Sequence, residues 1–183
     1  MYSDYFRFPF FSGLGRRKPA AWAYIQGSNA YPSIRGTVKF YETPGGVLVC
    51  TDVEGLPTSD AHCESPIFAF HIHNGTSCEQ KPKEDSAAPT EGEGESGTAT
   101  AEDAFPKSGT HDNPYGCLHP YHAGDLAPLF GVNGNAFSIF LTGRFAVRDI
   151  IGKTVIIHEK PDDFHTQPSG NSGAKIACGV IVH

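Results

Sequence analysis

Short runs of alternating hydrophobic and polar residues recur along most of the chain. In one run, apolar Ile34, Val38 and Phe40 are separated by polar residues, which predicts a strand because successive strand side chains point to opposite faces. The predicted strands cover residues 21–28, 33–41, 47–53, 66–73, 135–145, 153–158 and 175–182. Helical periodicity is almost absent. The pattern predicts an all-β fold, a Greek-key β-barrel or sandwich of about eight antiparallel strands with long loops.

Turn signals support this order. Residues 43–46 read Thr-Pro-Gly-Gly and are predicted to join the second and third strands as a hairpin. Residues 148–152 are expected to form a short turn. With 183 residues, the chain has the length of one well-cored domain. We therefore expect an irregular N-terminal arm over residues 1–20 and a single domain over residues 21–183.

An acidic stretch interrupts the strand pattern. The net charge is −6, and residues 79–110 alone carry eight acidic side chains and three lysines. Residues 79–108 are rich in Lys, Glu, Ser, Ala, Thr and Gly, and such a composition cannot bury enough apolar area to offset its ordering entropy. We predict a disordered insertion at about 79–108. The rest of the chain is nearly neutral, which makes nucleic acid an unlikely partner.

The sequence shows no membrane or export signal. No run approaches the roughly 18 apolar residues of a membrane span. The basic residues at 16–18 follow the aromatic patch at 8–11, whereas export signals place their positive charge first. We therefore expect a cytoplasmic protein with no membrane partner. Five cysteines without a Cys-x-x-Cys pair argue against a zinc finger or a thioredoxin-type site.

Histidines fall at informative positions. His71 and His73 end a predicted strand and, being two residues apart, leave it on one face. One later loop holds three more histidines and a carboxylate, and His158 ends another strand. Three imidazoles with one carboxylate suit tetrahedral zinc, and four imidazoles from different elements suit copper(II). The residues of the loop are His111, His119, His122 and Asp125.

In their motifs, these histidines resemble the copper/zinc superoxide dismutase family, in its bacterial type. The matching motifs are Phe-His71-Ile-His73 with Cys78 five residues later, Gly-Thr-His111-x-Asn-Pro with His119 eight residues later, His122-Ala-Gly-Asp125-Leu, Ile-Ile-Gly-Lys-Thr-Val-Ile-Ile-His158-Glu and Gly-Asn-x-Gly-Ala-Lys175-Ile-Ala-Cys178-Gly-Val-Ile. They follow one another in the family's order. The resemblance runs from about residue 21 to residue 181 and is interrupted mainly by the acidic stretch.

The resemblance implies a set of site residues. Copper would be held by His71, His73, His111 and His158. Zinc would be held by His111, His119, His122 and Asp125, so that His111 bridges the two ions. Asp162 would link a copper histidine to a zinc histidine and fix both rings. A disulfide would join Cys78 and Cys178.

It also implies the dismutation of superoxide, a small anion, to O2 and hydrogen peroxide, with His111 and Lys175 as the catalytic residues. Lys175 stands where the family places an arginine. Lysine keeps the positive charge but lacks the planar two-donor fork, so we expect reduced activity. Only two residues separate His119 from His122, fewer than is usual in the family.

The alternative is a non-catalytic, dismutase-like protein that stores or delivers copper and zinc. Lys175, the shortened loops and the acidic stretch favour it, whereas the complete ligand set argues against it. Cys63 and Cys117 are candidates for a second disulfide, and Cys50 is expected to be a buried thiol. A homodimer is compatible with the resemblance, but bacterial and eukaryotic members pair differently and the sequence does not choose between them.

Overall fold

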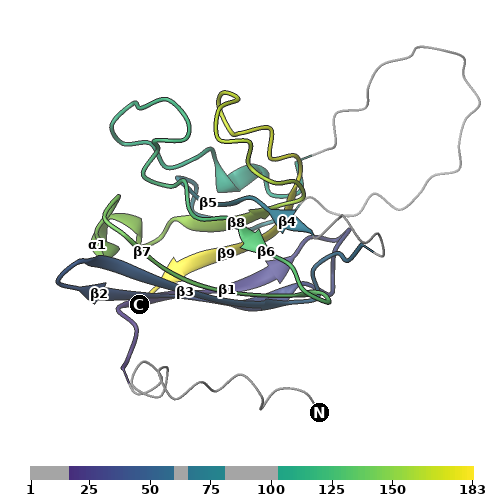
Figure 1. Cartoon of the computed structure of the whole chain (residues 1–183), viewed down its shortest axis with the longest axis horizontal. Coiled ribbons are helices and arrows are strands. Elements are labelled where there is room, and N and C mark those ends of the chain that lie inside the picture. Colours follow the sequence, from purple (N-terminus) through teal and green to yellow (C-terminus); the bar gives the residue numbers. More distant parts are fainter. Residues whose placement is uncertain (1–16, 60–65, 81–102) are drawn as a thin grey trace, which may run out of the picture.

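A curled, antiparallel sheet dominates the computed structural model, which describes residues 17–59, 66–80 and 103–183 (Figure 1). Seven strands pair in the order β5-β8-β9-β1-β2-β3-β7, and β4 pairs with β6 in a separate ribbon. The predicted all-β fold is confirmed. The strands are β1 (Ala21–Gly27), β2 (Arg35–Thr43), β3 (Gly46–Glu54), β4 (Ile67–Phe68), β5 (Phe70–His73), β6 (Leu129–Phe130), β7 (Asn135–Thr142), β8 (Thr154–His158) and β9 (Lys175–Val182).

The two-stranded ribbon lies between the two edges of the large sheet. β4 leads through Ala69 into the edge strand β5, and β6 precedes the other edge strand, β7. The prediction of one unbroken strand over residues 66–73 is therefore wrong at Ala69. The backbone N–H of Ala69 donates to the carbonyl of Lys160, at 2.8 Å, so the strand leaves its ladder there and contacts the loop after β8.

The turns lie where the sequence predicts them, but their conformations and the strand ends beside them differ from the prediction. The hairpin between β2 and β3 is present, with the Thr43 hydroxyl donating to the carbonyl of Gly46 at 2.8 Å. The strand predicted to reach residue 145 ends at Thr142. Residues Val147–Ile150 form a one-turn helix, α1, where the sequence predicted only a turn. The Asp149 carboxylate stabilises that turn by accepting the backbone N–H of Ala146 at 3.0 Å.

The hydrophobic core fills the inside of the curled sheet. Along β1 the inward positions Ala21, Ala23 and Ile25 are fully buried, whereas the positions between them are exposed. The same alternation brings residues of β2 and β3 to the core, among them Val38, Phe40 and Val49. Alternation along β1, β2 and β3 thus produces one buried inner face, as the sequence pattern predicts.

β5 and β8 depart from this alternation because every residue in them is buried. Phe70 and Ile72 belong to the core, and His71 and His73 lie on the opposite face of β5. Two long loops, residues 103–128 and 159–174, cover that outer face, on the upper side of Figure 1. The strand that carries the histidines is therefore placed between the core and the loops.

Part of the stretch that the sequence predicts to be disordered is folded. Phe105 is 1% exposed and packs with Ile156 and Cys178, and Pro106–Ser108 form a 3-10 helix. The prediction of disorder is therefore wrong for residues 103–108, because one aromatic side chain supplies enough apolar area to anchor them. On the other side of the stretch, the Gln80 side chain hydrogen-bonds to the backbone of Gly27 and Asn29. Residues 81–102 lie outside the described residues.

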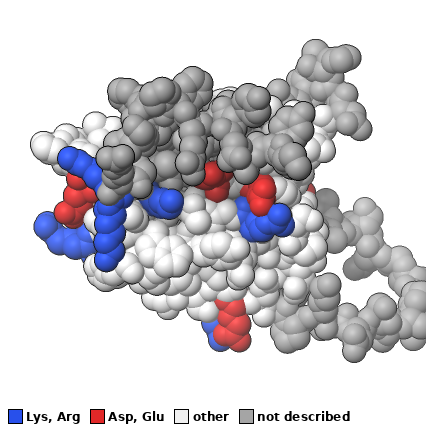
Figure 2. Space-filling view, turned by 90° about the horizontal axis from the view of Figure 1, so that it is seen from below, with Lys and Arg blue, Asp and Glu red and all other residues white. Residues whose placement is uncertain are grey.

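Other parts of the surface bear on the remaining expectations. Of the predicted arm, only residues 17–20 are described, and the N–H of Ala20 already pairs with the carbonyl of Phe40. On the face seen in Figure 2, basic and acidic side chains lie in small mixed groups with uncharged surface between them. Within the described residues, no helix has the length and apolar character needed to cross a membrane.

Candidate metal centre

The loop after the 3-10 helix is bonded directly to the histidine strand. Ile72 accepts a hydrogen bond from the N–H of Asp112 and donates to the carbonyl of Gly124, both at 2.8 Å. The N–H of Gly124 in turn donates to the carbonyl of Asp112. A Cβ at position 124 would lie 2.2 Å from the Ile72 oxygen, so this approach requires glycine. The loop thereby places His111 opposite His73.

Four buried histidines form the first group. His71 and His73 come from β5, His158 from the end of β8 and His111 from the loop. One ring nitrogen from each lies within 4.8 Å of the others. The rings of His71 and His111 are the nearest pair, with centroids 4.0 Å apart. The structure thus brings together the four residues that the resemblance assigns to copper.

Hydrogen bonds fix which nitrogen of each ring faces the middle of this group. Nδ1–H of His73 donates to the carbonyl of Gly109 at 2.9 Å, and Nδ1–H of His158 donates to the carbonyl of Gly173 at 3.2 Å. A carbonyl oxygen only accepts, so in both rings Nε2 carries the lone pair. These two Nε2 atoms lie 3.3 Å apart, facing each other.

Three buried ring nitrogens have no hydrogen-bond partner in the described part of the chain. They are Nδ1 of His71, Nε2 of His111 and Nδ1 of His119. An unpaired buried polar atom is costly, and nearly all such atoms in folded proteins are paired. Three of them in one cluster indicate that something other than protein binds there.

The second group converges on one carboxylate. The Asp125 oxygens lie 2.8 Å from Nδ1 of His111, 3.1 Å from Nδ1 of His119 and 3.3 Å from Nδ1 of His122. All four ligand atoms lie within 4.8 Å of one another, and all four residues are buried. These are the residues that the resemblance assigns to zinc. His111 belongs to both groups, with Nδ1 facing the second and Nε2 left for the first.

Asp162 connects the two groups. Its Oδ2 accepts Nε2–H of His71 and its Oδ1 accepts Nε2–H of His119, each at 2.8 Å. Burial raises the pKa of the Asp162 carboxyl, but the hydrogen bonds from His71, from the N–H of Phe164 and from His119 together hold that pKa well below its usual range. The carboxylate is therefore ionised, and it turns Nδ1 of both rings towards the two groups.

Gly170 allows the Asp162 side chain to sit where it does. A Cβ at position 170 would lie 1.9 Å from Oδ1 of Asp162 and 2.7 Å from Nε2 of His119, and the residue has φ +65°. Both the close approach and the left-handed backbone conformation favour glycine. The first glycine of the Gly-Asn-x-Gly motif is therefore required by the local packing, because it leaves room for the carboxylate that orients both rings.

Burial favours the neutral form of three histidines of the first group. It is the main cause that lowers the pKa of His71 and His73 below the ordinary histidine value, and it lowers that of His158 to about 3. Neutral imidazole is the form that binds a metal ion. The residues present therefore fit two metal ions: four imidazoles suit copper, and three imidazoles with a carboxylate suit zinc.

Sequence reasoning missed the side chains that hold the metal loop in place. Nη1 of Arg144 donates to the carbonyls of Pro120, His122 and Asp125, at 2.7, 3.0 and 3.3 Å. Gln167 binds both backbone groups of His119. These clamps fix the short His119–His122 connection. They lie 19 residues or more from the groups they bind, and no spacing rule signals such side-chain to backbone bonds.

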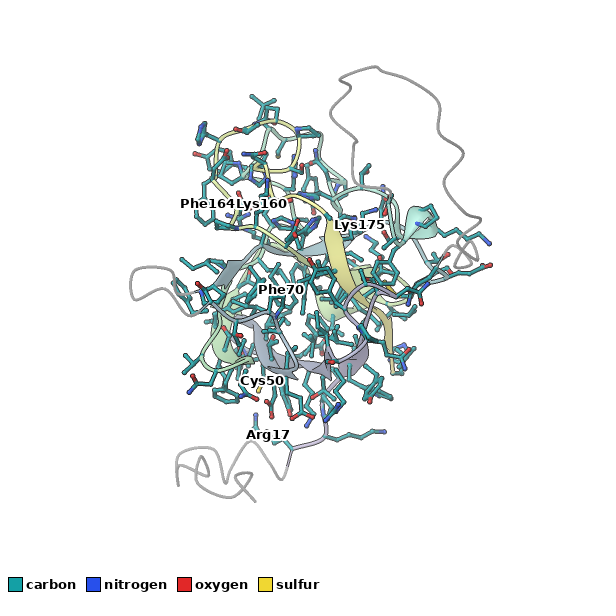
Figure 3. All side chains as sticks on the ribbon, turned by 90° about the vertical axis from the view of Figure 1, so that its right-hand side faces the viewer. Arg17, Cys50, Phe70, Lys160, Phe164 and Lys175 are labelled. Carbon is teal, nitrogen blue, oxygen red and sulfur yellow. A yellow bond between two sulfur atoms is a disulfide. The ribbon has the colours of Figure 1, made fainter. Side chains whose placement is uncertain are left out.

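The predicted lysine lies beside the first group. The Gly109 carbonyl that accepts Nδ1–H of His73 also accepts a hydrogen bond from Nζ of Lys175, at 3.2 Å. Figure 3 shows Lys175 at the start of β9, on the same side of Phe70 as the loop that carries Lys160 and Phe164.

A second lysine, Lys153, bonds both carboxylate oxygens of the buried Asp112, at 2.7 and 2.8 Å.

The cysteines follow the prediction in part. The disulfide between Cys78 and Cys178 is present and ties the segment after β5 to β9. Cys117 is a half-buried free thiol, so the structure does not support a bond to Cys63, which lies outside the described residues. Cys50 is half-buried rather than buried, because it lies on the outer face of β3. Burial is the main cause that raises the pKa of its thiol.

Comparisons with known proteins agree with this geometry. A family model described as copper/zinc superoxide dismutase matches residues 34–181. A copper/zinc superoxide dismutase of Aquifex aeolicus is 29% identical over 87% of this chain and 85% of its own length. One of Legionella pneumophila is 32% identical over 82% of this chain and 79% of its own length.

A solved structure supports the fold independently. The copper/zinc superoxide dismutase from Brucella abortus superimposes with a TM-score of 0.65 at 21% identity, over 87% of this chain and 98% of that one. At that identity the superposition supports the fold alone. The family model, by contrast, covers most of the chain, including both groups of ligand residues. The chain therefore belongs to the copper/zinc superoxide dismutase family.

Proposed function

We propose that this protein dismutates superoxide to O2 and hydrogen peroxide. Copper would be held by Nδ1 of His71 and Nε2 of His73, His111 and His158, and zinc by Nδ1 of His111, His119 and His122 with Asp125. The proposal rests above all on the three buried ring nitrogens that accept or donate no hydrogen bond among the described residues, one of them on the shared His111. Storage of a single metal would not require a histidine common to both groups.

The bound copper would supply the one-electron chemistry, by oxidising one superoxide and reducing the next. The chain's own residues prepare for it. Asp162 orients His71 and His119 through their Nε2–H groups, and Asp125 holds Nδ1 of His111. Among the described residues Nε2 of His111 has no hydrogen-bond partner, so when it is not holding copper it would be able to carry one of the two protons that hydrogen peroxide needs, the other coming from water. The charge of Lys175 attracts the anionic substrate towards His73.

The test combines metal analysis with kinetics. Protein loaded with copper and zinc should contain one of each per chain, and it should remove superoxide with a rate constant that falls as ionic strength rises, because steering of an anion is screened by salt. Lys175→Arg should raise that rate constant, since the guanidinium adds a second donor. Fully loaded protein that leaves superoxide decay at its spontaneous rate, with no gain from Lys175→Arg, contradicts the proposal.

One observation favours a second function, the storage or delivery of metal. Nζ of Lys175 lies within hydrogen-bond distance of four protein acceptors, so the cation that would attract substrate is already engaged. A storage protein should bind both metals and exchange them readily with a chelator while showing no dismutase activity. The loading experiment above distinguishes the two functions.

Two further expectations are carried as proposals. We propose a homodimer, supported by exposed Phe137 and Leu141 on the edge strand β7. Sedimentation of the loaded protein should then give twice the chain mass, and a single-chain mass over the micromolar range contradicts it. A cytoplasmic location stays a prediction, to be checked by fractionating cells that make the full-length protein.

A further inference from the structure

The ammonium group of Lys175 is saturated by protein acceptors. Nζ lies 2.8 Å from Oδ2 of Asp103, 2.9 Å from the hydroxyl of Ser108, 3.2 Å from the carbonyl of Gly109 and 3.4 Å from that of Phe105. An ammonium group has three N–H donors, fewer than these four acceptors. A small anion can therefore bind Lys175 only by displacing one of them.

Asp103 is the acceptor that matters most for an anion, because it is the charged one. Its Oδ1 accepts the N–H of Phe105 at 3.0 Å while its Oδ2 faces Lys175. Phe105 is 1% exposed and packs on Ile156 and Cys178, so the carboxylate is held by an anchored backbone. The Asp103 side chain is 45% exposed and that of Lys175 14%, so the carboxylate is the more accessible partner of this pair.

The pair lies next to the first group of histidines. Lys175 shares the Gly109 carbonyl with His73 and pairs with His158 in the β8–β9 ladder. Its charge also contributes to the lowered pKa of both histidines. A negative charge that neutralises Lys175 therefore acts directly beside His73 and His158.

We propose that Asp103 is a positioning residue that limits how strongly Lys175 attracts small anions to the copper group. The inference rests on the proposed function, in which Lys175 attracts superoxide. Asp103 offsets the positive charge and occupies one N–H of the ammonium group. Without the Asp103 charge, Lys175 is held only by the uncharged acceptors Ser108, Gly109 and Phe105. One N–H of its ammonium group can then bind an anion more readily.

Azide binding to the copper- and zinc-loaded protein provides the test, followed by the absorption change of the copper. Asp103→Asn keeps an oxygen for the N–H of Phe105 and removes the charge. It should tighten azide binding by about three- to tenfold at low salt, as expected for one charge several ångströms away at intermediate dielectric. The gain should shrink as salt is added. Asp103→Glu, which keeps the charge, should stay within about twofold of the wild type.

Glu79→Gln is the matched control. It removes one acidic charge from the other end of the same acidic stretch, where Glu79 pairs with Lys107 rather than with Lys175. Its effect on azide binding should be below about twofold, because its carboxylate is exposed and screened. In a Lys175→Met background, the effect of Asp103→Asn should fall to less than half of its value in the wild type.

Equal azide affinities in wild type and Asp103→Asn, or equal gains from Asp103→Asn and Glu79→Gln, overturn the inference. So does an undiminished effect of Asp103→Asn without Lys175. These results are separable from the proposed function, because azide binding does not require turnover. Protein that binds azide in an Asp103-dependent way but leaves superoxide unchanged supports the inference and contradicts dismutation. Protein that dismutates superoxide but binds azide equally well with and without the Asp103 charge supports the proposed function and contradicts the inference.

Discussion

At the scale of single residues, the site depends on side chains that fix the direction of others. Asp162 sets the direction of two imidazoles through one carboxylate, and Gly170 leaves room for it. Asp125 has two roles: its carboxylate faces Nδ1 of three histidines, and it also accepts the backbone N–H of His122 at 3.0 Å. Orientation in this centre therefore comes from a few buried carboxylates rather than from the histidines alone.

Asp162→Asn should weaken metal binding. An amide can accept from one imidazole but presents an NH2 group to the other, so one of His71 and His119 loses its fixed tautomer. We expect zinc affinity to fall by about 10- to 100-fold, as measured by competition with a chromophoric chelator. The control is the neighbouring Asp163→Asn, because the Asp163 side chain bonds to His165 and Thr166 of its own loop. Equal affinities for the two variants contradict the role of Asp162.

Acid should destabilise the metal-free protein. Burial lowers the pKa of His158 from 6.5 to about 3, so between these values the unfolded chain binds a proton that the folded chain does not. Its contribution to stability is fully present above about pH 6.5 and is lost as the pH falls towards about 3. His71 and His73, whose pKa values are also lowered, act in the same direction.

The measurement is urea unfolding of metal-free protein at pH 7 and pH 4.5. For His158 alone, the free energy of unfolding should be about 2–3 kcal/mol lower at pH 4.5. His158→Asn, which has no titratable group at this position, should show a smaller difference between the two pH values. A wild-type protein that is as stable at pH 4.5 as at pH 7 would show that the buried histidines do not govern this dependence.

At the scale of elements, strand alternation made the fold and the histidine strand predictable. Phe70 and Ile72 face the core and His71 and His73 face away from it, as a period of two requires. The histidine motifs then fixed which loop meets this strand. What the pattern could not supply was the local backbone: the break at Ala69 comes from a bond to Lys160, a residue more than ninety positions away.

The loop contacts were unpredictable for a related reason. Arg144, Gln167 and Asp103 bind backbone or side chains across the molecule, and a sequence gives no period or spacing for such bonds. The sequence predicts disorder for residues 103–108 because they adjoin the acidic stretch and share its composition. One buried ring, that of Phe105, decides their structure, and composition averaged over a window of thirty residues hides it.

Arg144 should be required to keep the loop of residues 119–125 ordered. Arg144→Ala removes the donor shared by the carbonyls of Pro120, His122 and Asp125, which leaves the loop less ordered before metal binds. We expect zinc affinity to fall by about tenfold and the loop to become more sensitive to protease in the metal-free protein. Arg148→Ala is the control, because the Arg148 side chain is 85% exposed and pairs with the adjacent Asp149. An equal change in both variants contradicts the clamp.

At the scale of the whole molecule, a core-forming barrel face and a loop-covered metal face share β5 and β8. The disulfide joins the segment after β5 to β9 on the loop-covered side, where Cys178 packs with Phe105 and Ile156. The loops are thus attached at several separate points: the disulfide, the Arg144 clamp and the Lys153–Asp112 pair. Stability and metal binding are therefore expected to be linked throughout the domain.

Loss of the disulfide should be costly. Cys78 and Cys178 are 100 positions apart, so the bond closes a long loop in the unfolded chain. For Cys78→Ser with Cys178→Ser, we expect the free energy of unfolding in urea to fall by about 3–5 kcal/mol. Cys117→Ser removes a free thiol and should change it by less than about 1 kcal/mol. Equal stabilities of the double variant and the wild type would contradict this contribution.

The two ends of residues 81–102 also have a practical meaning for engineering. Gln80 is bonded to the backbone of Gly27 and Asn29, and Asp103 is bonded to Lys175. Both junctions therefore belong to the folded domain, and one of them touches the residue proposed to attract the substrate. A reporter domain grafted between positions 80 and 103 would be joined directly to Asp103, whose carboxylate pairs with Lys175 beside the metal centre. The protein thus offers a ready attachment point for an optical sensor of anions.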